Sequence, residues 1–109
     1  MPVHEFGIMP KPPIKRKSYF RYEPEKYNCI SIDDDVLFAV SEKLKDIKSF
    51  WGKLGNESSG LDYYGVTMIP TESIPSFILI IKDHKEMAEF CKLLAKAETE
   101  NRWIIHFGI

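Results

Sequence analysis

The sequence predicts an α+β fold, a small β-sheet with about three helices packed on it, in the order β-β-α-β-α-α-β. Short segments in which apolar and polar residues alternate predict the strands. Apolar residues that recur at helical spacing predict the helices. An aromatic–glycine–β-branched triplet occurs three times, at 6–8, 64–66 and 107–109. A glycine beside an aromatic residue in a strand indicates that another backbone approaches the strand closely there. A neighbouring ring then covers the space that the missing side chain leaves. We therefore expect the three strands with these triplets to be neighbours in one sheet, with both chain ends fixed there.

The first elements are a strand and a connector, within one predicted domain over residues 1–109. Residues 3–8 alternate loosely between prolines, which predicts a short strand. Residues 10–27 form a proline-rich, basic and aromatic connector, because its prolines lack the amide donor that a helix or central strand needs. We expect an ordered loop held by its rings; a disordered basic arm is the alternative.

A second strand is predicted at 29–32, directly before three consecutive aspartates. Apolar residues then recur at helical spacing, at Val36, Leu37, Val40, Leu44 and Ile47. Asp33, Asp34 and Asp35 therefore fall at the cap and first turn of a helix, where carboxylates accept free amide hydrogens. We expect this helix to end near Lys48, with Phe50 and Trp51 packing after it. Residues 52–60, rich in Gly, Ser and Asn, read as the loosest stretch.

The second half predicts a strand, two helices and a final strand. Residues 61–69 form the strand, which Pro70 ends. Residues 76–81 follow the cap-like Thr71-Glu72-Ser73 and suit two structures. Their β-branched run is typical of a buried strand, whereas the capping residues and a proline tolerated only in a first turn indicate a helix; we favour the helix. A helix over 83–101 and a strand over 103–107 complete the chain.

Composition bounds the classes of function. Cys29 and Cys91 lie far apart among apolar neighbours, which favours reduced thiols in the core over a disulfide. The longest apolar run, 77–81, is far short of a membrane span, and no secretion signal is present, so we expect a cytoplasmic protein with no membrane partner. The basic segment 11–21 with its aromatic rings suits nucleic acid, but the net charge of −1 and the nearby Glu23 and Glu25 argue against it.

Two clusters carry candidate chemistry. Asp33, Asp34 and Asp35, with Asp62 as a partner, would suit a hard cation, but three consecutive residues do not face one point and helix capping is favoured. His4 and His106 would lie close together if the terminal strands pair, and would then share a metal or a proton; without a third ligand, hydrogen-bonded structural histidines are favoured. No nucleophile motif or phosphate loop is present, so we predict no enzyme, cofactor or metal.

Aromatic and acidic residues predict a protein-binding surface. Tyrosine and tryptophan dominate binding energy at protein interfaces. The residues of the predicted surface are Asp33, Asp34, Asp35, Trp51, Asp62 and Tyr63.

Five segments carry a family resemblance: 4–8 (HEFGI), 22–27 (YEPEKY), 30–35 (ISIDDD), 61–70 (LDYYGVTMIP) and 104–109 (IIHFGI). Together they resemble a group of small bacterial proteins similar to the antitoxin-like immunity proteins that accompany polymorphic secreted toxins of Firmicutes. The resemblance implies a protein that binds and neutralises a cognate toxin, and it implies no catalytic residue. The alternative is a homo-oligomeric or adaptor domain that pairs through exposed edge strands.

Overall fold

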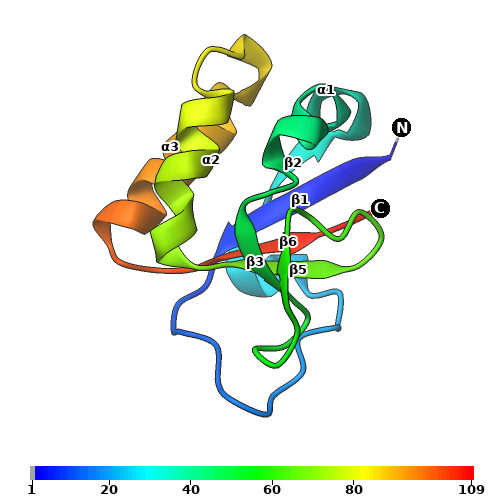
Figure 1. The fold of residues 1–109 in the computed structure, drawn as a ribbon, viewed down its shortest axis with the longest axis vertical. Helices are drawn as coiled ribbons and strands as arrows, with labels where there is room; N and C mark the ends of the chain where they lie inside the picture. Colours follow the sequence, from blue (N-terminus) through cyan, green and yellow to red (C-terminus); the bar gives the residue numbers. More distant parts are fainter. Residues whose placement is uncertain (1) are drawn as a thin grey trace.

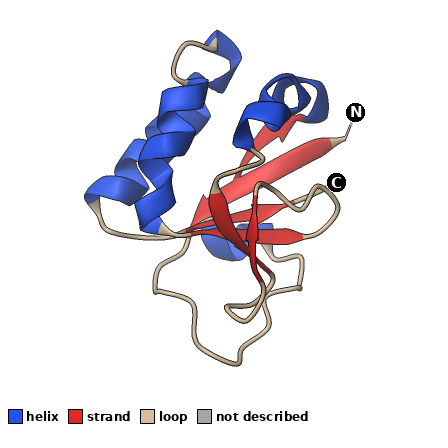
Figure 2. Ribbon diagram, viewed as in Figure 1, coloured by secondary structure: helices blue, strands red, loops and turns tan. Residues whose placement is uncertain are grey.

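The fold is α+β, as predicted, and is built on one antiparallel sheet. The computed structural model describes residues 2–109, every residue except Met1. Within them, six strands lie in the order β2-β1-β6-β5-β3-β4, and the helices pack against one face (Figures 1 and 2). The strands are β1 (Val3–Ile8), β2 (Ile30–Asp33), β3 (Lys48–Trp51), β4 (Glu57–Ser59), β5 (Val66–Ile69) and β6 (Ile104–Phe107). The helices are α1 (Asp34–Leu44), α2 (Ile74–Ile81) and α3 (Ala88–Thr99), and three short 3-10 helices are η1 (Pro24–Tyr27), η2 (Thr71–Ser73) and η3 (Lys85–Met87).

The strands beside the three triplets are neighbours at the centre of the sheet, which confirms the prediction. β6 lies between β1 and β5, with Gly7 opposite Ile105 and Val66 opposite Phe107. The Gly108 N–H donates to the Gly65 carbonyl over 2.7 Å where β5 and β6 meet. The N- and C-terminal ends therefore lie on the same side of the molecule (Figure 1).

The close approaches at these glycines come from segments outside the six strands. A Cβ at Gly7 would lie 2.7 Å from both the Cβ and the carbonyl oxygen of Tyr27. At Gly108 it would collide with the carbonyl of Tyr63. The glycines are needed because backbone atoms of Tyr27 and Tyr63 occupy the space of a side chain, and moving them is costly.

The sequence prediction was wrong between residues 45 and 65. The first helix ends at Leu44, and Phe50 and Trp51 belong to β3, which pairs with β4 as a hairpin. The polar β4 segment Glu57-Ser58-Ser59 carries no apolar alternation, because it is a three-residue edge strand with two exposed side chains. The strand predicted over 61–69 begins only at Val66, since residues 62–65 form a turn closed by Gly65 N–H and the Asp62 carbonyl.

Helices cover one face of the sheet. Alternate residues of the central strands, among them Phe6, Ile69 and Ile104, meet the buried stripes of α1, α2 and α3. Residues 74–81 form a helix, as favoured, because Pro75 sits in its first turn while Ile74, Phe77 and Ile81 are buried. α3 begins at Ala88, five residues later than predicted, after the short helix η3.

The connector 10–27 covers the opposite face. It packs Tyr27 and Tyr19 against a second apolar cluster of the sheet: Met9, Val66, Met68, Ile105 and Phe107. The Tyr19 N–H donates to the Gly52 carbonyl over 2.6 Å, which ties the connector to the β3–β4 hairpin. Both thiols are free, and burial is the main reason why the pKa of Cys29, beneath the connector, is raised to about 12.

The helices of residues 2–109 include none that is both long enough and apolar enough to cross a bilayer.

Candidate functional site

The most distinctive polar feature is a histidine pair on the helix-covered face of β1 and β6. His4 Nδ1 and His106 Nε2 lie 2.9 Å apart, and the rings are nearly parallel at 17°. Neither residue has any exposed surface. The pair is hydrogen-bonded, as favoured from the sequence, and the described part of the chain holds no group of three or more His, Cys, Asp or Glu side chains arranged to bind a metal.

The pair belongs to a longer hydrogen-bonded chain. His4 Nε2 lies 2.9 Å from Asp34 Oδ1, and His106 Nδ1 lies 3.2 Å from the Thr67 hydroxyl. That hydroxyl accepts the backbone N–H of Asp62 over 2.8 Å. We name these residues, Asp34, His4, His106, Thr67 and Asp62, the histidine network.

One arrangement of protons satisfies every member of the histidine network. Thr67 donates to His106 Nδ1, His106 Nε2–H donates to His4 Nδ1, and His4 Nε2–H donates to Asp34. Burial, helped by the neighbouring His4, lowers the pKa of His106 well below its usual range, so this imidazole is neutral. The hydrogen bond from His4 is the main cause that lowers the pKa of the Asp34 carboxyl, which is therefore ionised.

The network changes the interpretation of the three aspartates. Asp33 is the N-cap residue of α1, as predicted, but its side chain accepts no hydrogen bond from the helix amides. The carboxylate of Asp34 points to His4. The backbone N–H of Asp34 donates to the carbonyl of Pro2. Asp33 and Asp35 are exposed. The three aspartates therefore lie at the start of the helix, as predicted. The prediction that a cap carboxylate accepts hydrogen bonds from the free helix amides was wrong.

Tyr63 joins the network to the surface. Its ring lies edge-on against His4, with centroids 4.4 Å apart, and its hydroxyl is 3.4 Å from the Asp34 carbonyl. Burial raises the pKa of Tyr63, and the hydrogen bond with Asp34 raises it further. In the same loop, the Asp62 carboxylate accepts the backbone N–H of Tyr64 and fills the space beside Gly65. The loop 61–65 and the first turn of α1 are thus held on the sheet by one set of contacts.

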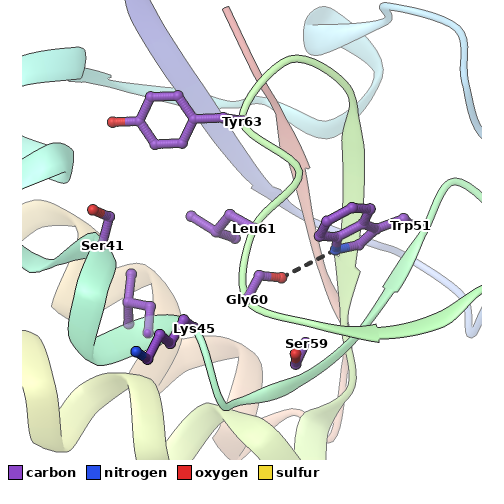
Figure 3. Close-up of a pocket in the computed structure, with 8 residues that line it drawn as sticks. Ser41, Lys45, Trp51, Ser59, Gly60, Leu61 and Tyr63 are labelled. Carbon is purple, nitrogen blue, oxygen red and sulfur yellow. Dashed lines mark hydrogen bonds between the residues drawn. The ribbon is translucent and has the colours of Figure 1, made fainter.

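A pocket of about 170 Å³ opens between this loop and α1 (Figure 3). Ser41 of α1 and Lys45, the residue directly after α1, line one side of it, and Leu61, Tyr63 and Trp51 face them across it. The Trp51 indole N–H donates to the Gly60 carbonyl over 3.2 Å, which fixes the ring at the pocket wall. The pocket is the size of one apolar side chain and carries hydroxyl and ammonium groups at its rim.

Two exposed rings flank this pocket region. Phe38 is 69% exposed and shares the helix face of Asp34 and Ser41, four residues after one and three before the other. Tyr64 is 79% exposed, and its ring centroid lies 6.0 Å from that of Tyr63. We define the acidic-aromatic surface as Asp33, Asp34, Asp35, Phe38, Asp62, Tyr63 and Tyr64.

The structure brings most of the predicted surface residues together. Asp34 contacts Tyr63, Asp62 lies in the same loop, and Trp51 shares the pocket with Tyr63. The sequence prediction omitted Phe38 and Thr67. Phe38 could have been found, because it is a ring that falls outside the apolar stripe of α1. Thr67 gave no local signal, since its histidine partner, His106, is 39 positions away in the sequence.

No protein-family model, curated protein or solved structure matches this chain.

Proposed function

We propose that this chain is a non-enzymatic, immunity-type protein of the cytoplasm that binds a cognate protein toxin through its acidic-aromatic surface and neutralises it. The observation that carries the proposal is the exposure of Phe38 and Tyr64 beside the carboxylates of Asp33 and Asp35. Large rings exposed beside a pocket are typical of the residues that dominate interface energies. The family resemblance of the sequence points to the same role.

The charge of the surface favours a basic partner. Two carboxylates are exposed at the start of α1, and that of Asp34 stays ionised through its hydrogen bond with His4. Complementary charge accelerates encounter and selects partners, while buried rings supply most of the affinity. The toxin surface should therefore combine Lys or Arg side chains with an apolar side chain that fits the pocket beside Tyr63.

The histidine network supports a binding role because it holds the surface rigid. Both imidazoles are fully buried and reach no substrate, but they connect β1 and β6 to α1 and to the loop 61–65. A surface that is already fixed loses less conformational entropy on binding.

Pairing through edge strands is the weaker alternative. The edges of the sheet are β2, of four residues, and β4, of three polar residues. Short edges offer few backbone groups to a partner strand.

Co-expression with the product of the neighbouring gene tests the proposal. We expect rescued growth and a complex on size-exclusion chromatography. The variant D33N/D35N/Y64A should weaken the complex by about 100-fold, because it removes one interface ring and two charges. The matched control E86Q/E89Q/L79A changes two exposed acids and one exposed apolar residue away from this surface, and should bind within about threefold of the unmodified protein. If the unmodified protein forms no complex and growth is not rescued, the proposed function is refuted. Equal losses of binding in both variants would refute the assignment of the binding surface.

A further inference from the structure

Two loops that are far apart in sequence meet at the end of the molecule opposite α1. The first part of the connector and the turn of the β3–β4 hairpin lie together at the bottom of Figure 1. Lys15 and Arg16 share a pocket of about 290 Å³ with Leu54 and Gly55. The Tyr19 N–H bonds to Gly52, and the Phe20 ring lies directly against it. We name this end the basic tip: Ile14, Lys15, Arg16, Lys17, Phe20, Lys53 and Leu54.

The basic tip and the residues that flank it concentrate positive charge, and Glu23 shares a pocket with Lys17 and Arg21 at their margin. Residues 11–22 and 52–56 contain six basic side chains and no Asp or Glu. The salt bridges of residues 2–109 involve none of these six side chains. The net charge of −1 for the whole chain therefore conceals a local excess of positive charge at the basic tip.

Apolar side chains project from the same tip. Ile14 is 59% exposed and Phe20 is 56% exposed, and Leu54 is half-buried beside Arg16. A turn closed by the Lys17 N–H and the Ile14 carbonyl, with Arg16 at a φ of 68°, carries Ile14 and the basic residues outward. Leaving aliphatic and aromatic groups in water is unfavourable, so this tip is unlike a solvated lysine-rich loop.

We infer that the basic tip binds the surface of an anionic phospholipid membrane. Lys and Arg side chains next to a membrane are attracted by its negative lipid headgroups, and apolar side chains among them enter the boundary between headgroups and acyl chains. Ile14 and Leu54 are aliphatic, so they suit acyl chains and offer no face on which a nucleic-acid base could stack. Phe20 is the aromatic ring of the tip, and it lies against Gly52. The sequence expectation of no membrane partner rested on the lack of a membrane-spanning segment. A spanning segment is needed to cross a bilayer but not to contact its surface.

This inference is independent of the proposed function, because it uses none of the acidic-aromatic surface. A protein bound through the basic tip would leave α1 and the loop 61–65 clear of the membrane (Figure 1).

Vesicle co-sedimentation tests the inference with the full chain. We expect binding to vesicles of phosphatidylcholine with phosphatidylglycerol, no binding to phosphatidylcholine alone, and weaker binding as salt is raised. The variant K15Q/R16Q/K17Q should lower the partition coefficient by about 100-fold. I14S/L54S, which keeps every charge, should lower it by about tenfold.

A matched control separates local from global charge. K43Q/K82Q/K92Q removes three exposed lysines outside the tip and should bind within about threefold of the unmodified protein. Circular dichroism confirms that each variant is folded. Equal losses for both triple variants, or no vesicle binding by the unmodified chain, would overturn the inference. So would tip-dependent binding of a single-stranded oligonucleotide without vesicle binding.

Discussion

The two faces of the sheet are closed in different ways. On one face, α1, α2 and α3 bury stripes of large apolar side chains against β1, β5 and β6. On the other face, the connector 10–27, which is irregular except for η1, covers the same strands with a few anchored rings. Regular helices satisfy their own backbone groups, whereas the connector must bond to its surroundings, as Tyr19 does to Gly52. An irregular segment can therefore serve as a layer where aromatic rings and glycines let its backbone lie close to the sheet.

The difference has consequences for surface chemistry. The helix-covered face closes over the histidine network, which fixes α1 and the loop 61–65. The connector keeps its basic side chains outside, since it buries only rings and aliphatic groups.

The largest expected difference between the faces concerns ring removal. Phe77→Ala empties a fully buried site on the helix-covered face and should lower the free energy of unfolding by about 3–5 kcal/mol. Tyr19→Ala removes a half-buried connector ring and should cost about 1 kcal/mol. Urea denaturation followed by circular dichroism measures both. Equal losses would show that the connector is as essential to the core as the helices are.

A methyl group added beneath the connector should have an intermediate effect. Gly7→Ala places a Cβ 2.7 Å from the backbone of Tyr27 and 2.8 Å from the Cys29 thiol, so the connector must shift, at about 1–3 kcal/mol. Native Cys29 should react slowly with a disulfide reagent because its pKa is about 12. In Gly7→Ala this reaction should accelerate.

Gly55→Ala is the matched control, because a Cβ there meets nothing within 4 Å and its φ is not in the left-handed region. Its stability should change by less than about 0.5 kcal/mol. If both alanine variants behave alike, the close approach at Gly7 does not constrain the connector.

The smallest effect is a pH dependence specific to the helix-covered face. As pH falls through about 6.5, a histidine of the unfolded chain binds a proton while buried His106, with its lowered pKa, does not. The unfolded state then holds more protons, so stability falls with pH by at most about 1.4 kcal/mol per pH unit. Asp34, whose pKa is also lowered, adds a further loss only as pH falls below about 4.

His106→Gln tests this dependence, since the glutamine amide can donate to His4 and accept from Thr67 without titrating. Urea midpoints measured between pH 7 and pH 5 should decline less in His106→Gln than in the unmodified protein. Identical slopes in the two proteins would mean that His106 is not held neutral by its burial.

Elements with a strong local pattern were predictable. The three helices and the central strands follow from apolar spacing, and Pro75 in a first turn correctly favoured a helix for residues 74–81. The β3–β4 hairpin was missed, because edge strands this short and polar carry little periodicity. The grouping of Asp34, Asp62 and Tyr63 was anticipated in outline. The hydrogen bond between Asp34 and His4 was not, because these two residues are 30 positions apart in the sequence.

The sequence by itself determined the α+β class, the neighbouring strands around Gly7, Gly65 and Gly108, and the kinds of side chain available for binding. These follow from local periodicity and from the need for glycine where backbones approach closely. Only the tertiary structure decided which side chains share a surface. It placed Phe38 and Tyr64 near the carboxylates, Lys15 and Arg16 beside Leu54, and Asp34 on a buried histidine. The physical reason is that a contact between distant segments depends on strand order and loop path, and neither is encoded in the residues near the contact.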